Sequence, residues 1–123
     1  MIGSFKWPVY TDDEINTVAT VLKEGNVNYL FGKYGKEFEK EFSNYHELKF
    51  GCCVSNGTVA LEILLKSLNL NAGDEVIVPS AGFISTAAAV ISAGTRPVFA
   101  DVSLETQNIC HKSVQMCLSS KTR

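Results

Sequence analysis

The pattern of apolar and polar positions changes near residue 48 of the chain. Before that point, apolar residues recur at helical spacing in two stretches, one following a capping-box pattern at 11–14 and the other spanning about 36–47. Gly25 predicts the end of the first stretch, because glycine readily takes the left-handed conformation that closes a helix. We therefore expect residues 1–48 to form an N-terminal helical segment.

From residue 49 onward, short apolar runs alternate with helical stretches. The runs predict strands at about 50–54, 75–79 and 97–102, and the helical stretches lie at about 57–68, 84–93 and 111–118. Strands linked by helices favour an α/β fold with parallel strands, so residues 49–123 are assigned to an α/β domain. The spacing of apolar residues at 57–68 predicts a mostly buried helix.

A segment rich in aromatic residues and glycine joins the two N-terminal helices. It runs from Val27 to Gly35 and holds Tyr29, Phe31 and Tyr34. Such a segment either packs on its own domain or reaches onto a partner subunit, and composition does not distinguish the two.

Composition limits the classes of protein to which the chain can belong. Its 123 residues are 46% hydrophobic and 20% charged, which is typical of one soluble globular domain. A net charge of -2 argues against nucleic-acid binding. The longest apolar run, at 87–93, is too short to cross a membrane. Because the first residues lack the apolar centre of a signal peptide, we expect a cytoplasmic protein.

Neither the cysteines nor the histidines form a recognisable site in the sequence. The four cysteines lack the spacing of a zinc site, and His46 and His111 lie alone among polar neighbours. We therefore predict no metal site, and we expect the cysteines to be reduced in a cytoplasmic protein.

The most informative stretch is the small-residue turn Ser55–Thr58, which lies between a predicted strand and a predicted helix. Such a turn points backbone N–H groups and the positive end of the helix dipole at one spot, which suits a phosphate group. Gly57 lets a ligand approach the backbone closely, and Thr58 adds a hydroxyl. The same residues would equally serve as an ordinary loop with a Ser/Asn helix cap.

A second loop, Ser80–Phe83, follows the next predicted strand and is expected at the same edge of the sheet. Phe83 there would stack on the ring of a planar, phosphorylated cofactor. Its spacing also fits a core residue at the start of the following helix. The chain has no P-loop and no GxGxxG motif, which argues against simple nucleotide binding.

Three motifs occur in order along the chain: Val54–Leu61, Gly73–Ser80 and Gly94–Val102. In their order and spacing they closely resemble the N-terminal third of the DegT/DnrJ/StrS sugar aminotransferases. Trp7-Pro8 and the residues around Phe38 are similar to the opening of the same family. The resemblance therefore covers nearly the whole chain.

The resemblance implies a fold-type I enzyme that depends on pyridoxal 5′-phosphate (PLP) and works as a homodimer. In that fold the chain would be an incomplete portion of a three-layer α/β large domain, preceded by the N-terminal helical segment. Such enzymes transfer an amino group, usually from glutamate, to a keto sugar linked to a nucleotide. Their products feed polysaccharide or glycoside biosynthesis.

The family's site residues carry over to four positions of this chain. Gly57, Thr58 and the amide of Val59 would hold the cofactor phosphate, and Phe83 would stack on the pyridine ring. The aromatic segment around 29–35 resembles one that lies near the active site across the dimer.

The resemblance also implies that none of the residues 1–123 is catalytic. In the family, the acid that pairs with the pyridine nitrogen and the lysine that binds the cofactor covalently both lie downstream of the position of Arg123. We therefore expect that the chain alone does not transaminate. We also expect it to fold poorly, because in the family's sheet the strands between the one before Ser55 and those at 75–79 and 97–102 come from downstream sequence, and without them strand edges stay unpaired. The alternatives are a non-catalytic module that binds a phosphorylated ligand or a partner, and an inert truncated product.

Overall fold

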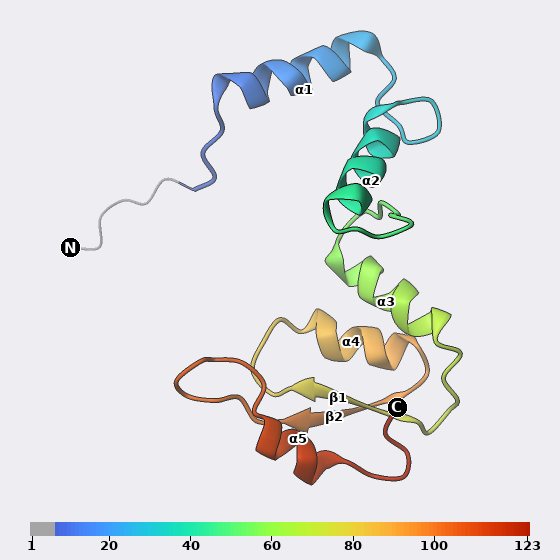
Figure 1. The fold of residues 1–123 in the computed structure, drawn as a ribbon, viewed down its shortest axis with the longest axis vertical. Helices are drawn as coiled ribbons and strands as arrows, with labels where there is room; N and C mark the ends of the chain where they lie inside the picture. The colour runs from blue at the N-terminus through green and yellow to red at the C-terminus, as the bar shows by residue number, and fades with distance from the viewer. Residues whose placement is uncertain (1–6) are drawn as a thin grey trace, which may run out of the picture. The chain divides into compact units, whose positions relative to one another are not determined.

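The computed structural model describes residues 7–123, which form five helices and two strands (Figure 1). In chain order these are α1 (Asp12–Glu24), α2 (Tyr34–Tyr45), α3 (Gly57–Ser67), β1 (Glu75–Pro79), α4 (Ser85–Ser92), β2 (Arg96–Ala100) and α5 (His111–Cys117). The chain divides into two compact units, Met1–Cys53 and Val54–Arg123.

The first helix begins and ends where local sequence signals place it. The Thr11 N–H donates to the Glu14 carboxylate at 2.7 Å, and the Glu14 N–H donates to the Thr11 hydroxyl at 3.3 Å. These reciprocal bonds form the predicted capping box, and the bond from the Thr11 N–H lowers the pKa of Glu14. At the other end, Gly25 has φ of 75° and its N–H donates to the Leu22 carbonyl at 3.2 Å, so the predicted stop is confirmed.

The strand expected at about 50–54 is absent, and this prediction was wrong. These residues pair with no other described strand. The backbone N–H of Cys53 donates instead to the Glu39 carboxylate at 2.6 Å. An apolar run becomes a strand only where another strand accepts its hydrogen bonds, and a side chain of α2 fills that role here.

The second unit is built on a parallel pair of strands. β1 and β2 are in register from Glu75 opposite Arg96 to Pro79 opposite Ala100. α4 connects the two strands and covers one face of the pair, and α5 lies on the other face (Figure 1). The fully buried apolar side chains of this unit are Val78, Ala89, Val90 and Ala100. Their position shows that the core is the contact between α4 and the strand pair.

The third helix is much more exposed than its apolar spacing predicts. None of its residues is buried, and the exposed fractions are 53% for Ile63 and 56% for Leu64. Within its unit α3 packs on α4. Only one side of an apolar helix is therefore covered, because one neighbouring helix cannot shield its whole circumference.

The last residues of the chain add to the outer edge of β1. The Glu75 N–H donates to the Lys121 carbonyl at 2.9 Å, and the Arg123 N–H donates to the Glu75 carbonyl at 3.0 Å. Thr122 forms a parallel bridge with Glu75. β1 is therefore paired on both sides at its amino end, by β2 and by residues 119–123, a feature that our sequence analysis missed.

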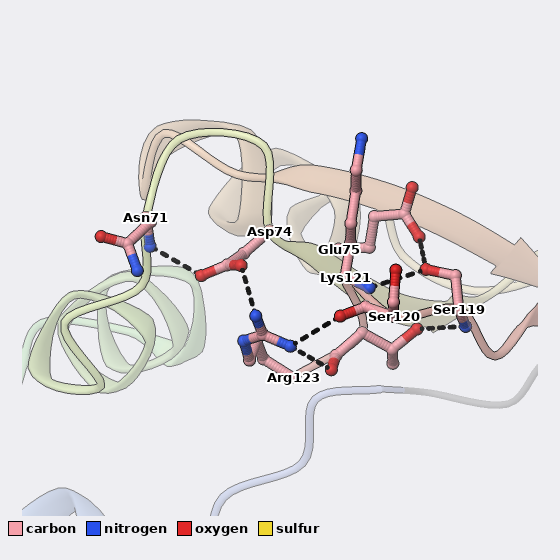
Figure 2. Close-up of polar contacts among 8 residues, drawn as sticks. Asn71, Asp74, Glu75, Ser119, Ser120, Lys121 and Arg123 are labelled. Atoms are coloured by element: carbon pink, nitrogen blue, oxygen red, sulfur yellow. Dashed lines mark hydrogen bonds and ion pairs between the residues drawn. The ribbon is translucent and has the colours of Figure 1, made fainter.

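The buried carboxylates of Asp74 and Glu75 lie beside residues 119–123 at the amino end of β1 (Figure 2). Asp74 accepts the Asn71 N–H at 2.8 Å and lies 3.3 Å from the Arg123 guanidinium. Glu75 accepts the Ser119 hydroxyl at 2.6 Å. Buried charge is tolerated when it is paired and hydrogen-bonded, and residues 119–123 supply partners to both carboxylates.

We predict that Asp74 contributes more to the stability of β1 than Arg123 does. Asp74→Ala removes a turn hydrogen bond and an ion pair from a buried position, at about 2 kcal/mol. Arg123→Ala removes the ion pair and the exposed hydrogen bonds from the guanidinium to the Ser120 and Thr122 carbonyls. Because the Arg123 side chain is half-exposed, we expect this loss to cost less than about 1 kcal/mol. Hydrogen exchange of the amides in the β1 peptide, followed by mass spectrometry, measures the destabilisation that each substitution causes.

Arg96→Ala is the matched control for this comparison. The Arg96 guanidinium is 3.8 Å from Glu75 and 70% exposed, so its removal should leave the β1 exchange rate unchanged. Equal effects from Asp74→Ala and Arg96→Ala would contradict the prediction.

We also predict that the isolated 123-residue chain self-associates. Ile15, Val18 and Leu22 leave an apolar face of α1 exposed, in addition to the exposed side chains of α3. Exposed apolar faces of this kind favour association in water. Light scattering on a gel-filtered sample measures the mass, and a monodisperse monomer with a cooperative melt would oppose this expectation.

Candidate cofactor-binding site

The amino ends of α3 and α4 border one hollow in the second unit. Gly57 and Thr58 line it from α3, Phe83 lines it from the loop before α4, and its volume is about 620 Å³. The other lining residues are Asn56, Ala60, Leu61, Leu64 and Ser85. A hollow of this size is in the range of small-molecule pockets. The packing of α3 on α4 therefore brings three of the four predicted site residues to one place.

The amino end of α3 offers two unused backbone donors. Asn56, the cap residue, is extended, and its backbone carbonyl accepts the Ala60 N–H at 3.1 Å. Among the hydrogen bonds of the described residues, none uses the N–H groups of Gly57 and Thr58. These two donors and the positive end of the helix dipole favour an anion at this position.

Space beside the backbone is open at Gly57. A Cβ atom added to Gly57 would meet no other atom within 4 Å, so packing within the chain does not require glycine there. An anionic group can therefore approach the backbone at this point, and a side chain would narrow the approach. The hydroxyl of Thr58 lies on the next residue. The donor set fits a phosphate group.

The Val59 amide differs from its two neighbours. Its N–H donates to the Asn56 side-chain carbonyl at 3.0 Å, which is the usual helix-cap bond. A phosphate that used all three amides would have to displace the Asn56 oxygen. The role predicted for Val59 therefore requires a rearrangement that Gly57 and Thr58 do not require.

Phe83 is not a core residue of this structure. Its side chain is 76% exposed and lines the hollow beside Gly57 and Thr58. An exposed ring next to two free amide donors suits a ligand that has both a flat face and an anionic group. Its stacking role stays a prediction.

The hollow has no charged side chain among its lining residues. In particular, no lysine and no acid borders it. In residues 7–123 no group of three or more His, Cys, Asp or Glu side chains is placed to hold a metal ion. No helix in the same range is long and apolar enough to span a bilayer.

The first unit holds a network that our sequence analysis missed. Glu39 accepts hydrogen bonds from the Tyr29 hydroxyl at 2.9 Å and from the Cys53 N–H at 2.6 Å. A glutamate on the polar side of a helix carries no local signal for such contacts, since both partners are distant in sequence. The aromatic segment is therefore held, at least in part, by its own unit.

Comparisons with a family model, with relatives and with solved structures point to the same family of aminotransferases. The model of the DegT/DnrJ/EryC1/StrS aminotransferase family matches residues 8–123. GDP-perosamine synthase of Vibrio cholerae is 36% identical over 92 residues, which are 75% of this chain and 25% of that protein.

Two solved structures extend the comparison to three dimensions. An aminotransferase from Psychrobacter cryohalolentis is 39% identical, with a TM-score of 0.89 over 96% of this chain and 30% of that one. The GDP-4-keto-6-deoxy-D-mannose-3-dehydratase of E. coli, solved with bound hydrated PLP, is 26% identical, with a TM-score of 0.80 over 94% of this chain and 31% of that one. The likeness confirms the predicted fold class, an incomplete α/β fold. The chain spans less than a third of the length of each of these three proteins.

The cap residue offers a test of the site geometry. We predict that Asn56→Ala destabilises α3 by about 1 kcal/mol, because the Val59 N–H loses its acceptor. Asn56→Asp should keep the cap but place a negative charge beside the free amides, so it should weaken phosphate binding more than helix stability. Hydrogen exchange of the α3 amides measures the helix stability of Asn56→Ala. A phosphate titration that is monitored through the protection of the same amides measures the phosphate affinity of Asn56→Asp. An Asn56→Asp variant that binds phosphate as well as the parent would argue against an anion site here.

Proposed function

Because the chain belongs to the DegT/DnrJ/EryC1/StrS aminotransferase family, we propose that it is the N-terminal part of a PLP-dependent aminotransferase that acts on a nucleotide-linked keto sugar. The observation that carries the proposal is the hollow of the second unit. Two free amide donors, the Thr58 hydroxyl and the exposed ring of Phe83 border the same space there. These groups match the phosphate and the flat ring of PLP.

The four predicted site residues each have a part in this proposal. The N–H groups of Gly57 and Thr58 and the Thr58 hydroxyl bind the phosphate, and Phe83 covers one face of the ring. The Val59 amide joins them once the Asn56 side chain releases it. PLP, when bound, supplies the conjugated ring that acts as an electron sink. The residues described here bind and orient it.

Proton transfer and covalent attachment need groups that this hollow lacks. An amine must bind the cofactor aldehyde, and an acid must pair with the ring nitrogen. Neither lines the hollow. We therefore propose that residues 7–123 contribute cofactor binding and no catalytic group. From membership of the family we further propose that glutamate is the amino donor and that the working enzyme is a homodimer in the cytoplasm.

Amination is favoured over dehydration as the reaction. The aminotransferase structure is 39% identical to this chain and GDP-perosamine synthase is 36% identical, whereas the dehydratase is 26% identical. The hollow itself does not choose between the two reactions, since both types of enzyme need the cofactor phosphate and ring to be held. A module that binds a phosphorylated ligand without catalysis has the same hollow, and activity of the holoenzyme separates it from an aminotransferase.

The absence of a lysine from the hollow leads to a testable prediction. With PLP and borohydride, we expect scattered, substoichiometric labelling of exposed lysines in the 123-residue chain, because none lines the hollow. Peptide mapping of the reduced sample measures this. Pyridoxal, which lacks the phosphate, is the control and should label the same lysines. A single lysine labelled stoichiometrically, and by PLP only, would show that the site has been assigned wrongly.

The stacking role of Phe83 is tested in the holoenzyme that contains this chain. Phe83→Ala should weaken cofactor retention by about 1–3 kcal/mol, a range typical of a planar ring stacked on an aromatic side chain. Stability should change little, because the side chain is exposed. Equilibrium dialysis of PLP measures retention, and Phe99→Ala, another exposed phenylalanine that does not line the hollow, is the control. Unchanged retention in Phe83→Ala would exclude stacking.

A further inference from the structure

Glu39 lies in the middle of α2 and uses both carboxylate oxygens to join two other segments. Oε2 accepts the hydrogen bond from the Tyr29 hydroxyl, and Oε1 accepts the one from the Cys53 N–H. Tyr29 belongs to the aromatic segment 27–35, and Cys53 ends the irregular stretch that follows α2. One half-buried side chain therefore connects three parts of the first unit.

The aromatic segment that Glu39 contacts has an ordered structure of its own. Asn28 accepts the Gly32 N–H at 2.7 Å through its backbone carbonyl and the Phe31 N–H at 3.0 Å through its side chain. A Cβ added to Gly35 would lie 2.8 Å from the Tyr29 ring, so the ring rests directly on that glycine. The ring position, and with it the direction of the Tyr29 hydroxyl, is thus set by close packing.

The stretch that ends at Cys53 is fitted to α2 in the same way. A Cβ added to Gly51 would lie 2.8 Å from the Glu39 backbone carbonyl, and the Cys53 thiol lies 3.6 Å from the Gly35 carbonyl. Val54 alone separates Cys53 from Ser55, where the turn proposed to hold phosphate begins. The Glu39 contact therefore lies close in sequence to that turn.

The Glu39 carboxylate raises the pKa values of the Tyr29 hydroxyl and the Cys53 thiol, which favours their protonated forms. The hydrogen bond to Glu39 raises the pKa of Tyr29, with smaller contributions from burial and from the thiols of Cys52 and Cys53. Burial raises the pKa of Cys53, and the Glu39 charge adds to it. The Lys36 ammonium lies 5.9 Å from the Tyr29 ring centre. At neutral pH the Tyr29 hydroxyl therefore stays protonated and donates.

We propose that Glu39 is a positioning residue that holds the aromatic segment against the stretch entering the phosphate turn, so that removing its carboxylate loosens both. Two independent contacts of one side chain carry this inference. It rests on the proposed function only in that the turn at 55–58 holds the cofactor. The network itself is present without any cofactor.

Amide exchange of the 123-residue chain, followed by mass spectrometry, tests the proposal. Glu39→Ala should speed exchange about tenfold in the peptides covering 27–35 and 50–54, because both lose a charge-assisted hydrogen bond. Tyr29→Phe should speed exchange in 27–35 only, since the bond to Cys53 remains. Glu37→Ala is the control, because the Glu37 side chain makes no hydrogen bond or ion pair with the described residues.

The behaviour of α2 distinguishes positioning from a general effect on the helix. Alanine is the better helix former, so Glu39→Ala should not speed exchange within α2 itself. Unchanged exchange in 27–35 and 50–54, or equal acceleration through α2, would overturn the proposal. So would the same pattern in Glu37→Ala. Failure of PLP binding alongside the expected exchange pattern would count against the proposed function and uphold the role of Glu39.

Discussion

The parallel pairing of β1 with β2 is the interaction on which the second unit depends. Parallel strands cannot be joined by a tight turn, so the chain must cross over from the end of one strand to the start of the next, and α4 makes that crossing. Burying Val78 and Ala100 under Ala89 and Val90 stabilises the pair and the helix together. The loop that carries Phe83 leaves the carboxyl end of β1 as a consequence, and α3 borders the hollow because it packs on α4.

The two ends of β1 differ in electrostatic character. At the amino end, the carboxylates of Asp74 and Glu75 are buried and supplied with partners. Beyond the carboxyl end, the hollow is lined by uncharged residues and bordered by free amide donors. An anion in the hollow therefore meets no carboxylate on its lining, and dipoles alone provide the attraction. The arrangement separates the charges that stabilise the strand from the place where a phosphate would bind.

The features that the sequence predicted well are those with local signals. The capping box at Thr11 and the stop at Gly25 depend on residues a few positions apart, and the strand at 75–79 is a short apolar run with a turn before it. The strand predicted at 50–54 is absent because a strand also needs a partner strand, and the Cys53 N–H donates to the Glu39 carboxylate instead. The pairing of residues 119–123 with β1 was missed for the same reason, since it joins polar residues far apart in sequence.

For the candidate site, the sequence predicted the turn and the aromatic ring but not whether the backbone amides of the turn are free. Whether the Val59 N–H is free depends on the conformation of the Asn56 side chain, which is a property of the folded turn. The exposure of Phe83 depends on which helix faces pack together. Ligand binding and helix order are thermodynamically linked at this site: a phosphate that binds only the ordered amino end of α3 stabilises that helix. Because α3 packs on one side only, a phosphate bound at its free amides would add to the stability that packing on α4 gives it.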